Sequence, residues 1–316
     1  TTSTADQPNT VVAASVSGDA SRDQTFIAAC NVASANGLRS SVIASSGVGA
    51  GIITTSATAP DSLVAACSTA LNDVSTNSAR SCALASTAGA GGSVRTTGTD
   101  TLIAASTSVT GPVDASGGRN VILACDEATT SSNQSAAIAS KTAIASGTDS
   151  AVISSDTGTA SGQDSAVISC IDAQATTAKS TVISSEDVAA SGIASLVAAS
   201  VGNTAGTGIL STTGARSTIV SGLCSSTGDM TVSGGTSAII ASKTANASNV
   251  TAGGTETAIV ASSSDGVFGA VTTDGSNATV IASSGCTGGF AGKANSAVIA
   301  SQGSTAVDDH SMTAAS

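Results

Sequence analysis

The residues best able to do chemistry in this sequence are seven cysteines. Four of them occupy the last position of a recurring six-residue phrase in which most other copies carry serine: Cys30, Cys67, Cys125 and Cys170. They fall on copies that are never adjacent, so at ~4.8 Å per strand the nearest pair would be ~10 Å apart, beyond disulfide reach. No Cys-x-x-Cys or Cys/His spacing of a metal site occurs. We interpret these cysteines as small buried thiols and expect no bound metal.

Histidine and acidic residues offer the other candidate chemistry. His310 is the only histidine and follows two aspartates, but serine is so frequent that a Ser-His-Asp combination on paper carries no information. The acidic pairs 126–127 and 186–187 each follow the phrase directly and could bind Ca²⁺ at a corner. Since the calcium-roll repeat is absent, we interpret them as solvated corners. The sequence predicts no catalytic residue, no cofactor and no enzyme activity.

A recurring phrase organises the whole chain. In the centre it returns every fifteen residues as SAAIAS, SAVISS, SAVISC, STVISS and SLVAAS. Eighteen copies can be recognised, spaced by 15 or 16 residues at the start and in the middle and mostly by 18–22 elsewhere. They begin at residues 10, 25, 41, 62, 81, 101, 120, 135, 150, 165, 180, 195, 217, 237, 257, 278, 296 and 311.

A fixed period of this length is typical of a solenoid. The phrase is short, rich in Val and Ile and bounded by Ser, Gly, Asp and Asn, which predicts a strand. A second, shorter strand is expected between copies, as at 142–146 or 157–161. We therefore predict an all-β parallel β-solenoid of about 18 rungs. It would form one domain over 10–316 after a lead-in over 1–9, with enlarged loops around 47–119 and 201–295.

The composition supports a thin core extended in one dimension. The chain has no Trp or Tyr, only three Phe, and 10% charged residues. Small side chains cannot fill a thick globular core at native density. The net charge of −11 on ten basic residues excludes a nucleic-acid partner, which needs a basic stripe. No apolar run approaches ~18 residues, so we expect no membrane insertion.

Side-chain size is compensated within the phrase. Positions 2, 4 and 6 share one face of a strand. Where position 2 is large, position 4 is Ala, and where position 2 is small, position 4 is large, in seventeen of eighteen copies. Constant summed volume is a property of close-packed interiors. We therefore predict that this face is the core, represented by Phe26, Leu63, Leu102, Ile138, Ile153, Ile168, Ile183, Leu196, Ile240, Val260, Ile281 and Ile299.

The opposite face of the phrase is apolar as well. Position 3 is Val or Ile in fifteen copies, and position 5 is Ala or Ser in all of them. A strand that is apolar on both faces is normally covered on both. We expect a second copy of the chain to supply the second cover, which predicts a homo-oligomer. The alternative is a wider single-chain coil that encloses both faces.

The segment SAVISSDTGTASGQDSAVISC (150–170) resembles the head repeats of trimeric autotransporter adhesins and the related repeats of bacteriophage tail-fibre and tail-spike proteins. The resemblance implies a left-handed parallel β-roll with three chains side by side, on the outside of a cell or virion. The phrase usually ends in Ala-Ser or Ser-Ser where the adhesin pattern has Gly, and this favours the phage proteins.

The resemblance predicts a structural shaft of a phage tail fibre or similar extracellular appendage that supports host attachment. The alternative is a bacterial adhesin head whose loops bind a host-surface glycan or protein. A depolymerase spike ranks third because aromatic platforms and a carboxylate pair are missing. Some phage spikes carry a C-terminal chaperone domain that cuts itself off after a serine, which makes Ser316 a candidate cleavage terminus. Alternatively, Ser316 is an arbitrary boundary.

Overall fold

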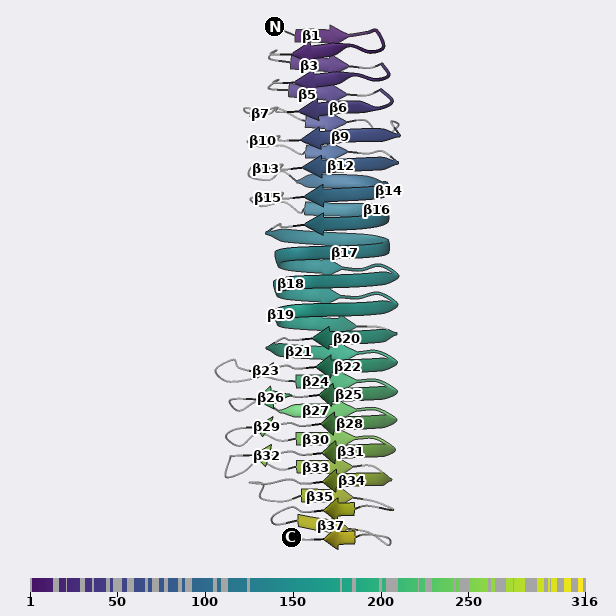
Figure 1. The fold of residues 1–316 in the computed structure, drawn as a ribbon, viewed down its shortest axis with the longest axis vertical. Helices are drawn as coiled ribbons and strands as arrows, with labels where there is room; N and C mark the ends of the chain where they lie inside the picture. Colours follow the sequence, from purple (N-terminus) through teal and green to yellow (C-terminus); the bar gives the residue numbers. More distant parts are fainter. Residues whose placement is uncertain are drawn as a thin grey trace. The chain divides into compact units, whose positions relative to one another are not determined.

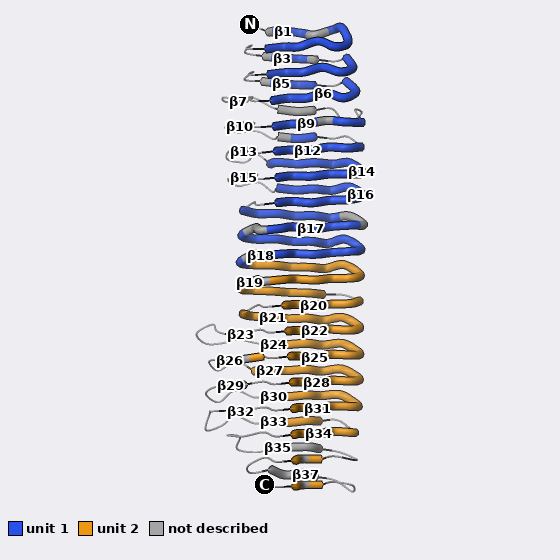
Figure 2. Tube along the Cα trace, viewed as in Figure 1, with its two compact units in different colours: residues 1–156 blue, residues 157–316 orange. Residues whose placement is uncertain are grey.

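The computed structural model is all-β in the part of the chain that it describes. Contacts divide the chain into two compact units, residues 1–156 and 157–316 (Figure 2), and each is described by itself. The single domain over 10–316 remains a prediction. The described residues are 2–13, 17–20, 22–28, 32–35, 37–43, 46–47, 53–55, 60–65, 68–69, 74–76, 79–84, 87–88, 93–104, 107–108, 113–123, 126–176, 178–183, 186–198, 201–202, 210–220, 222–224, 229–240, 243–244, 250–260, 263–264, 271–274, 276–281, 289–292, 295, 297–299, 304–307 and 312–314.

Strands of unit 1 are short and mostly come in pairs, one pair for each turn of the chain. They are β1 (Thr2–Ala5), β2 (Val11–Ala13), β3 (Ser17–Ala20), β4 (Phe26–Ala28), β5 (Val32–Ala35), β6 (Ser40–Ile43), β7 (Ser46–Gly47), β8 (Ile53–Thr55), β9 (Asp61–Ala65), β10 (Ser68–Thr69), β11 (Val74–Thr76), β12 (Arg80–Leu84), β13 (Thr87–Ala88), β14 (Val94–Ala104), β15 (Thr107–Ser108), β16 (Val113–Leu123) and β17 (Glu127–Ala145). The next strand, β18 (Asp149–Ala160), contains the residue at which the units are divided.

Strands of unit 2 follow the same scheme. They are β19 (Asp164–Thr176), β20 (Lys179–Ile183), β21 (Asp187–Ser191), β22 (Ala194–Ala198), β23 (Val201–Gly202), β24 (Leu210–Thr213), β25 (Arg216–Val220), β26 (Leu223–Cys224), β27 (Met230–Ser233), β28 (Thr236–Ile240), β29 (Lys243–Thr244), β30 (Val250–Gly253), β31 (Glu256–Val260), β32 (Ser263–Ser264), β33 (Val271–Asp274), β34 (Asn277–Ile281), β35 (Gly289–Gly292), β36 (Ala297–Ile299), β37 (Ser304–Val307) and β38 (Met312–Ala314).

Each unit is a parallel β-solenoid, as the sequence predicted (Figure 1). In unit 2, each phrase strand pairs in parallel with the phrase strand of the next turn, in the order β19, β20, β22, β25, β28, β31, β34, β36 and β38. The return strands form a second ladder, in the order β19, β21, β24, β27, β30, β33, β35 and β37. Nine phrase strands are therefore stacked in register in the described residues of unit 2.

Unit 1 repeats this arrangement. Its phrase strands pair in the order β2, β4, β6, β9, β12, β14, β16 and β17. Two details differ from the sequence prediction. Residues 2–5, predicted as lead-in, form β1 and pair with β3. Ser41 pairs with Phe26, so the third phrase begins at Ser40 rather than Ser41 and keeps the spacing of fifteen residues.

The core of each solenoid is built from positions 1 and 3 of the phrase. Position 3 is fully buried in turn after turn, as at Ile219, Ile239 and Ile259 in unit 2. Inward side chains of the return strands, such as Leu210 and Met230, are fully buried as well. The predicted second strand is confirmed at 142–146, where the alternate residues 143 and 145 are buried. A thin core of medium-sized side chains therefore fills each turn.

The prediction that positions 2 and 4 form this core was wrong. They lie on the outer face of the phrase strand, where side chains are half-buried or exposed. This applies to Phe26, Leu63, Leu102, Ile138, Ile153, Ile168, Ile183, Leu196, Ile240, Val260, Ile281 and Ile299. Because faces alternate along a strand, burying position 1 turns position 3 inward and positions 2 and 4 outward.

A buried serine at position 1 determines this orientation. Ser217 Oγ lies 3.2 Å from the carbonyl oxygen of Gly214, three residues earlier, and 3.2 Å from that of Ser233 in the next turn, so its single O–H can donate to either or be shared between them. Ser195 and Ser237 make the same two contacts in their turns. Each hydroxyl thus joins its own corner to the neighbouring return strand. A buried hydroxyl that makes these bonds is stable inside the core, whereas one without partners costs ~1–3 kcal/mol.

Glycine is required where these corners stack. A Cβ added to Gly214 would lie 1.6 Å from the carbonyl oxygen of Gly192, and one added to Gly234 would lie 1.6 Å from the oxygen of Gly214. The corner backbones are therefore too close for any side chain. The Gly-x-x-Ser spacing in the sequence is the local cause of both the close approach and the hydroxyl bonds.

Gly234→Ala should destabilise unit 2, because the new methyl group would overlap backbone that cannot move away. Overpacking of this kind costs ~1–3 kcal/mol or more. Gly253→Ala is the matched control, since a Cβ at Gly253 would meet nothing within 4 Å. Thermal and urea unfolding followed by circular dichroism will compare the two. Equal stability of the two variants would contradict the stacked-corner geometry.

Ile239→Asp and Ile240→Asp provide a test of which face is inside. Ile239 is fully buried, and Ile240, the next residue, is 42% exposed. Asp at 239 would place an unpaired charge in the dry core and should cost several kcal/mol, with loss of β-structure by circular dichroism. Asp at 240 should leave the fold of the chain intact. The opposite ranking of unfolding midpoints would restore the original prediction of the core.

Candidate functional site

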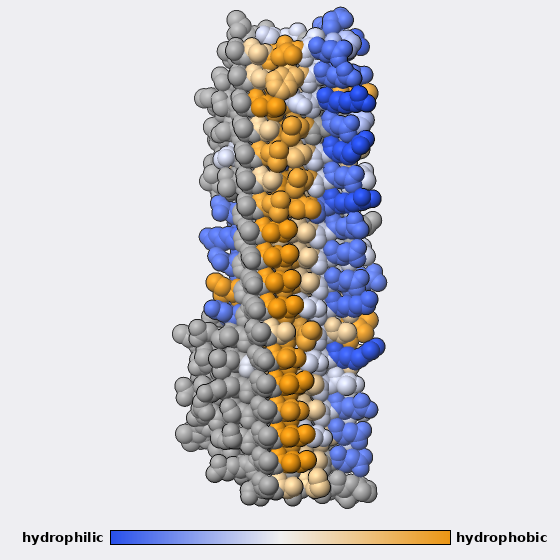
Figure 3. Space-filling model, in the orientation of Figure 1, coloured by the Kyte–Doolittle hydropathy of each residue, from blue (hydrophilic) through white to orange (hydrophobic). Residues whose placement is uncertain are grey.

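The first candidate surface is the outer apolar face, defined as positions 2 and 4 of the phrase strands. In Figure 3 it is visible as an apolar stripe that follows these strands in each unit. In unit 2 its exposed large members are Ile183, Ile240, Ile281 and Met312, which are 37–52% exposed. In the described turns every residue at positions 2 and 4 is uncharged. A regular apolar surface of this kind is suited to contact with another macromolecule.

A column of charged residues runs beside this face. We call it the corner column: the residue directly before each phrase, five of which in unit 1 alternate in sign as Arg39, Asp61, Arg80, Asp100 and Arg119. It corresponds to the hydrophilic stripe next to the apolar one in Figure 3. The alternation places opposite charges on adjacent strands.

Four ion pairs form along the corner columns of the described residues. Asp61 accepts from Arg80 at 2.9 Å and lies 3.9 Å from Arg39. Arg119 and Asp100 are 3.5 Å apart, and in unit 2 Lys179 and Asp164 are 3.2 Å apart. All these side chains are between 41% and 73% exposed, so each pair contributes at most ~1 kcal/mol. The sequence analysis missed this column. Its signal was the alternating charge at one fixed position of the repeat.

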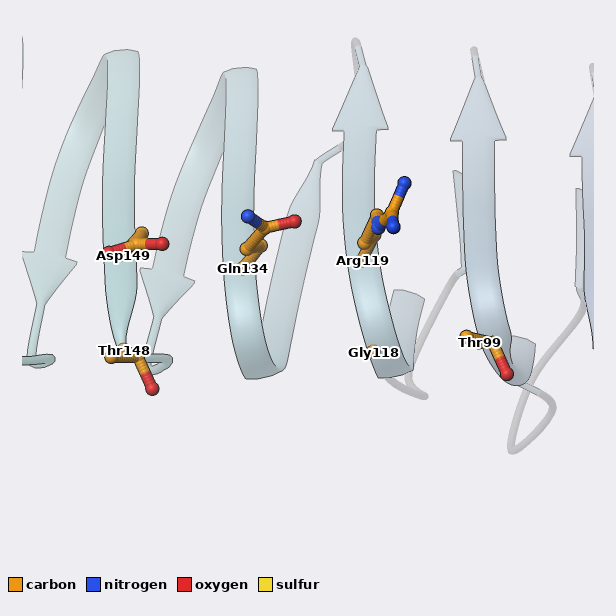
Figure 4. A pocket seen from close by; sticks show the side chains of 6 residues that line it. All are labelled: Thr99, Gly118, Arg119, Gln134, Thr148 and Asp149. Atoms are coloured by element: carbon orange, nitrogen blue, oxygen red, sulfur yellow. The ribbon is translucent and has the colours of Figure 1, made fainter.

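A shallow polar groove of ≈ 500 Å³ lies on the corner column of unit 1 (Figure 4). Arg119, Gln134 and Asp149 lie side by side on successive turns, with Thr99 and Thr148 at the groove's edge. Together they present a guanidinium, an amide, a carboxylate and hydroxyl groups. Such a set can make hydrogen bonds to the hydroxyl groups of a sugar or to a peptide backbone.

The predicted acidic corner at 186–187 lies beside a second hollow in unit 2. There Asp187 is in register with Asp172 on the preceding turn, and Gln174 and Ser211 complete the lining. Two neighbouring carboxylates are too few ligands for a Ca²⁺ site. In the described parts of the chain, no three His, Cys, Asp or Glu side chains are grouped to hold a metal ion.

Most of the sequence candidates for chemistry cannot be placed. Cys30, Cys67, Cys125, Ser316 and His310 lie outside the described residues, and Cys170 is placed only as a residue of β19. Cys82 occupies position 2, where partial burial raises the pKa of its thiol. Asp114, on the outer side of a return strand, also has a raised pKa because of burial, although the guanidinium of Arg95 opposes the shift.

Comparison of the chain with protein-family models, with curated proteins and with solved structures found no match. The described residues contain no helix that could cross a membrane. The structure therefore defines the class of the protein, a parallel β-solenoid built from an internal repeat, and its assignment goes no further than that class.

Asp61→Lys should weaken unit 1, because it removes two ion pairs and places three cations on successive turns. The expected cost is roughly 1 kcal/mol at low ionic strength, and it should shrink in high salt because exposed charges are screened. Asp61→Asn, which only removes the attraction, should cost less. The unfolding midpoints of both variants, measured at low and high salt, will show whether the loss of stability depends on charge. A salt-independent difference between the two variants would argue against a role of the corner column in stacking.

Proposed function

We propose that this chain is the structural shaft of a phage tail fibre or a similar extracellular appendage, supporting attachment to a host surface. The observation that carries the proposal is the in-register repetition of one phrase in every turn of both units, with a continuous uncharged apolar stripe on its outer side. A shaft needs a uniform surface of this kind, because identical turns can associate along their full length.

The repeat is also mechanically suited to a shaft that resists bending. Each phrase strand pairs on both sides with strands of the neighbouring turns, so bending would strain many hydrogen bonds at once. The proposed shaft has about eighteen rungs, which at ~4.8 Å per rung corresponds to a length of ~85 Å. Left-handed winding and a trimer follow from the resemblance to adhesin and tail-fibre repeats. The partners are copies of the same chain, with no nucleic acid and no membrane insertion.

The second candidate, a bacterial adhesin head, is favoured by the enlarged loops. In unit 1 they form a separate parallel ladder of the short strands β7, β10, β13 and β15. In unit 2, β23, β26, β29 and β32 form another. Stacked loops present a regular surface that a host glycan or protein could contact, as could the groove at Arg119. A depolymerase spike is the third candidate, because the sequence offers neither aromatic platforms for a sugar nor a catalytic carboxylate pair.

The shaft proposal is tested by mass and shape. At micromolar concentration the purified chain should have three times its own mass by native mass spectrometry, and electron microscopy should show rods ~85 Å long. Antibodies against the chain, labelled with gold, should then decorate the fibres of a virion. A stable monomer would reject the shaft, and gold on a cell surface instead of a virion would favour the adhesin.

A further inference from the structure

The outer apolar face of unit 2 follows a rule of side-chain size in every turn, although it points away from the core. Each turn has one large and one small residue at positions 2 and 4. The described pairs are Ala166 and Ile168, Thr181 and Ile183, Leu196 and Ala198, Thr218 and Val220, Ala238 and Ile240, Ala258 and Val260, Thr279 and Ile281, Ala297 and Ile299, and Met312 and Ala314. Water accommodates side chains of any volume, so exposure to solvent imposes no such rule. Volume is constrained only by close packing against another solid surface.

The pairs give this face a ridge and a valley. Position 4 forms the ridge, in which Ile183 and Val220 flank the small Ala198. Position 2 forms the valley, in which Thr181 and Thr218 flank the large Leu196. The gap in the ridge and the projection in the valley thus occur in the same turn. Every charge lies off this face, and interface cores are depleted in charged residues.

Two identical faces of this kind can meet in two ways. If the copies are parallel and related by rotation about the stacking direction, their strands run in opposite directions across the contact, and position 2 of one copy faces position 4 of the other. If they are antiparallel, position 4 faces position 4, and ridge meets ridge. Only the parallel contact places a large side chain against a small one in every turn.

We propose that the outer apolar face of unit 2 binds a second copy of this chain, parallel and in register, with Leu196 of each copy seated against Ala198 of its neighbour. A partner must offer one matching side chain for each ~4.8 Å strand spacing, and another turn of the same solenoid does so. A shift of one turn would place Leu196 against Ile183 or Val220. This pair of residues therefore specifies the register, and the proposal rests on the self-assembling shaft described above.

The test uses three variants of the whole chain: Leu196→Ala, Ala198→Leu and the double exchange. Both positions lie outside the core, so all three should keep the circular dichroism spectrum of the wild type. Each single change leaves a gap or a clash in every contact and should weaken association at least tenfold by sedimentation velocity. The double exchange restores one large and one small residue in that turn and should assemble as tightly as the wild type.

A mixing experiment separates a loss of matching between copies from a loss of folding stability, because reduced stability alone would not change which chains associate. When differently tagged wild-type and double-exchange chains are refolded together, Leu196 would meet the leucine introduced at 198. Mixed oligomers should therefore be at least tenfold rarer than random assortment predicts. Free mixing, or single variants that associate like the wild type, would overturn the inference and leave the shaft proposal standing. A wild-type chain that stays monomeric would reject both.

Discussion

A buried serine hydroxyl at the start of the phrase, as at Ser195, Ser217 and Ser237, is the interaction that holds successive turns of unit 2 together at their corners. A serine at position 1 satisfies its own hydrogen-bonding needs by joining a glycine carbonyl of its corner to a carbonyl of the next turn. The corner backbones approach closely here, and a Cβ at Gly214 or Gly234 would overlap the carbonyl of the preceding turn. Once the hydroxyl is inside, alternation places position 3 in the core and positions 2 and 4 outside. In these turns the polar contact accompanies the inward orientation of position 3, and Thr25, Ser81 and Thr257 are buried at the same position without a hydrogen-bond partner.

The thin core has an energetic consequence. In the described residues the apolar core consists of Val, Ile and Ala with an occasional Leu or Met. Each turn therefore buries a modest apolar area, and this burial contributes ~25 cal/mol of stabilising free energy for each Å². Stability must then come from repetition, because each turn is supported by the turns on either side. The exposed ion pairs of the corner column add little energy individually, but their alternating signs disfavour any shift that would bring like charges together.

The outer face of the phrase strands is apolar, although the chain has a net charge of −11. In the described residues the charges lie off this face, many of them in the corner column. The outer face of the phrase strands remains uncharged and regular, which fits an assembly of identical chains. This separation of charge from contact surface is what links the repeat to the proposed role as a shaft. The groove around Arg119 and the stacked loops remain the surfaces available for contact with other molecules.

The sequence by itself determined the fold class, the position of nearly every phrase strand and the existence of the return strands. These follow from a period and from local strand chemistry, which need no knowledge of distant contacts. It also showed that Leu196 with Ala198 and Ala238 with Ile240 obey a common volume rule. Sequence alone could not decide whether that rule described the core or the surface, because both faces of the phrase are apolar. Only the tertiary structure, by burying the serine at position 1 against the next turn, placed Ile239 inside and Ile240 outside.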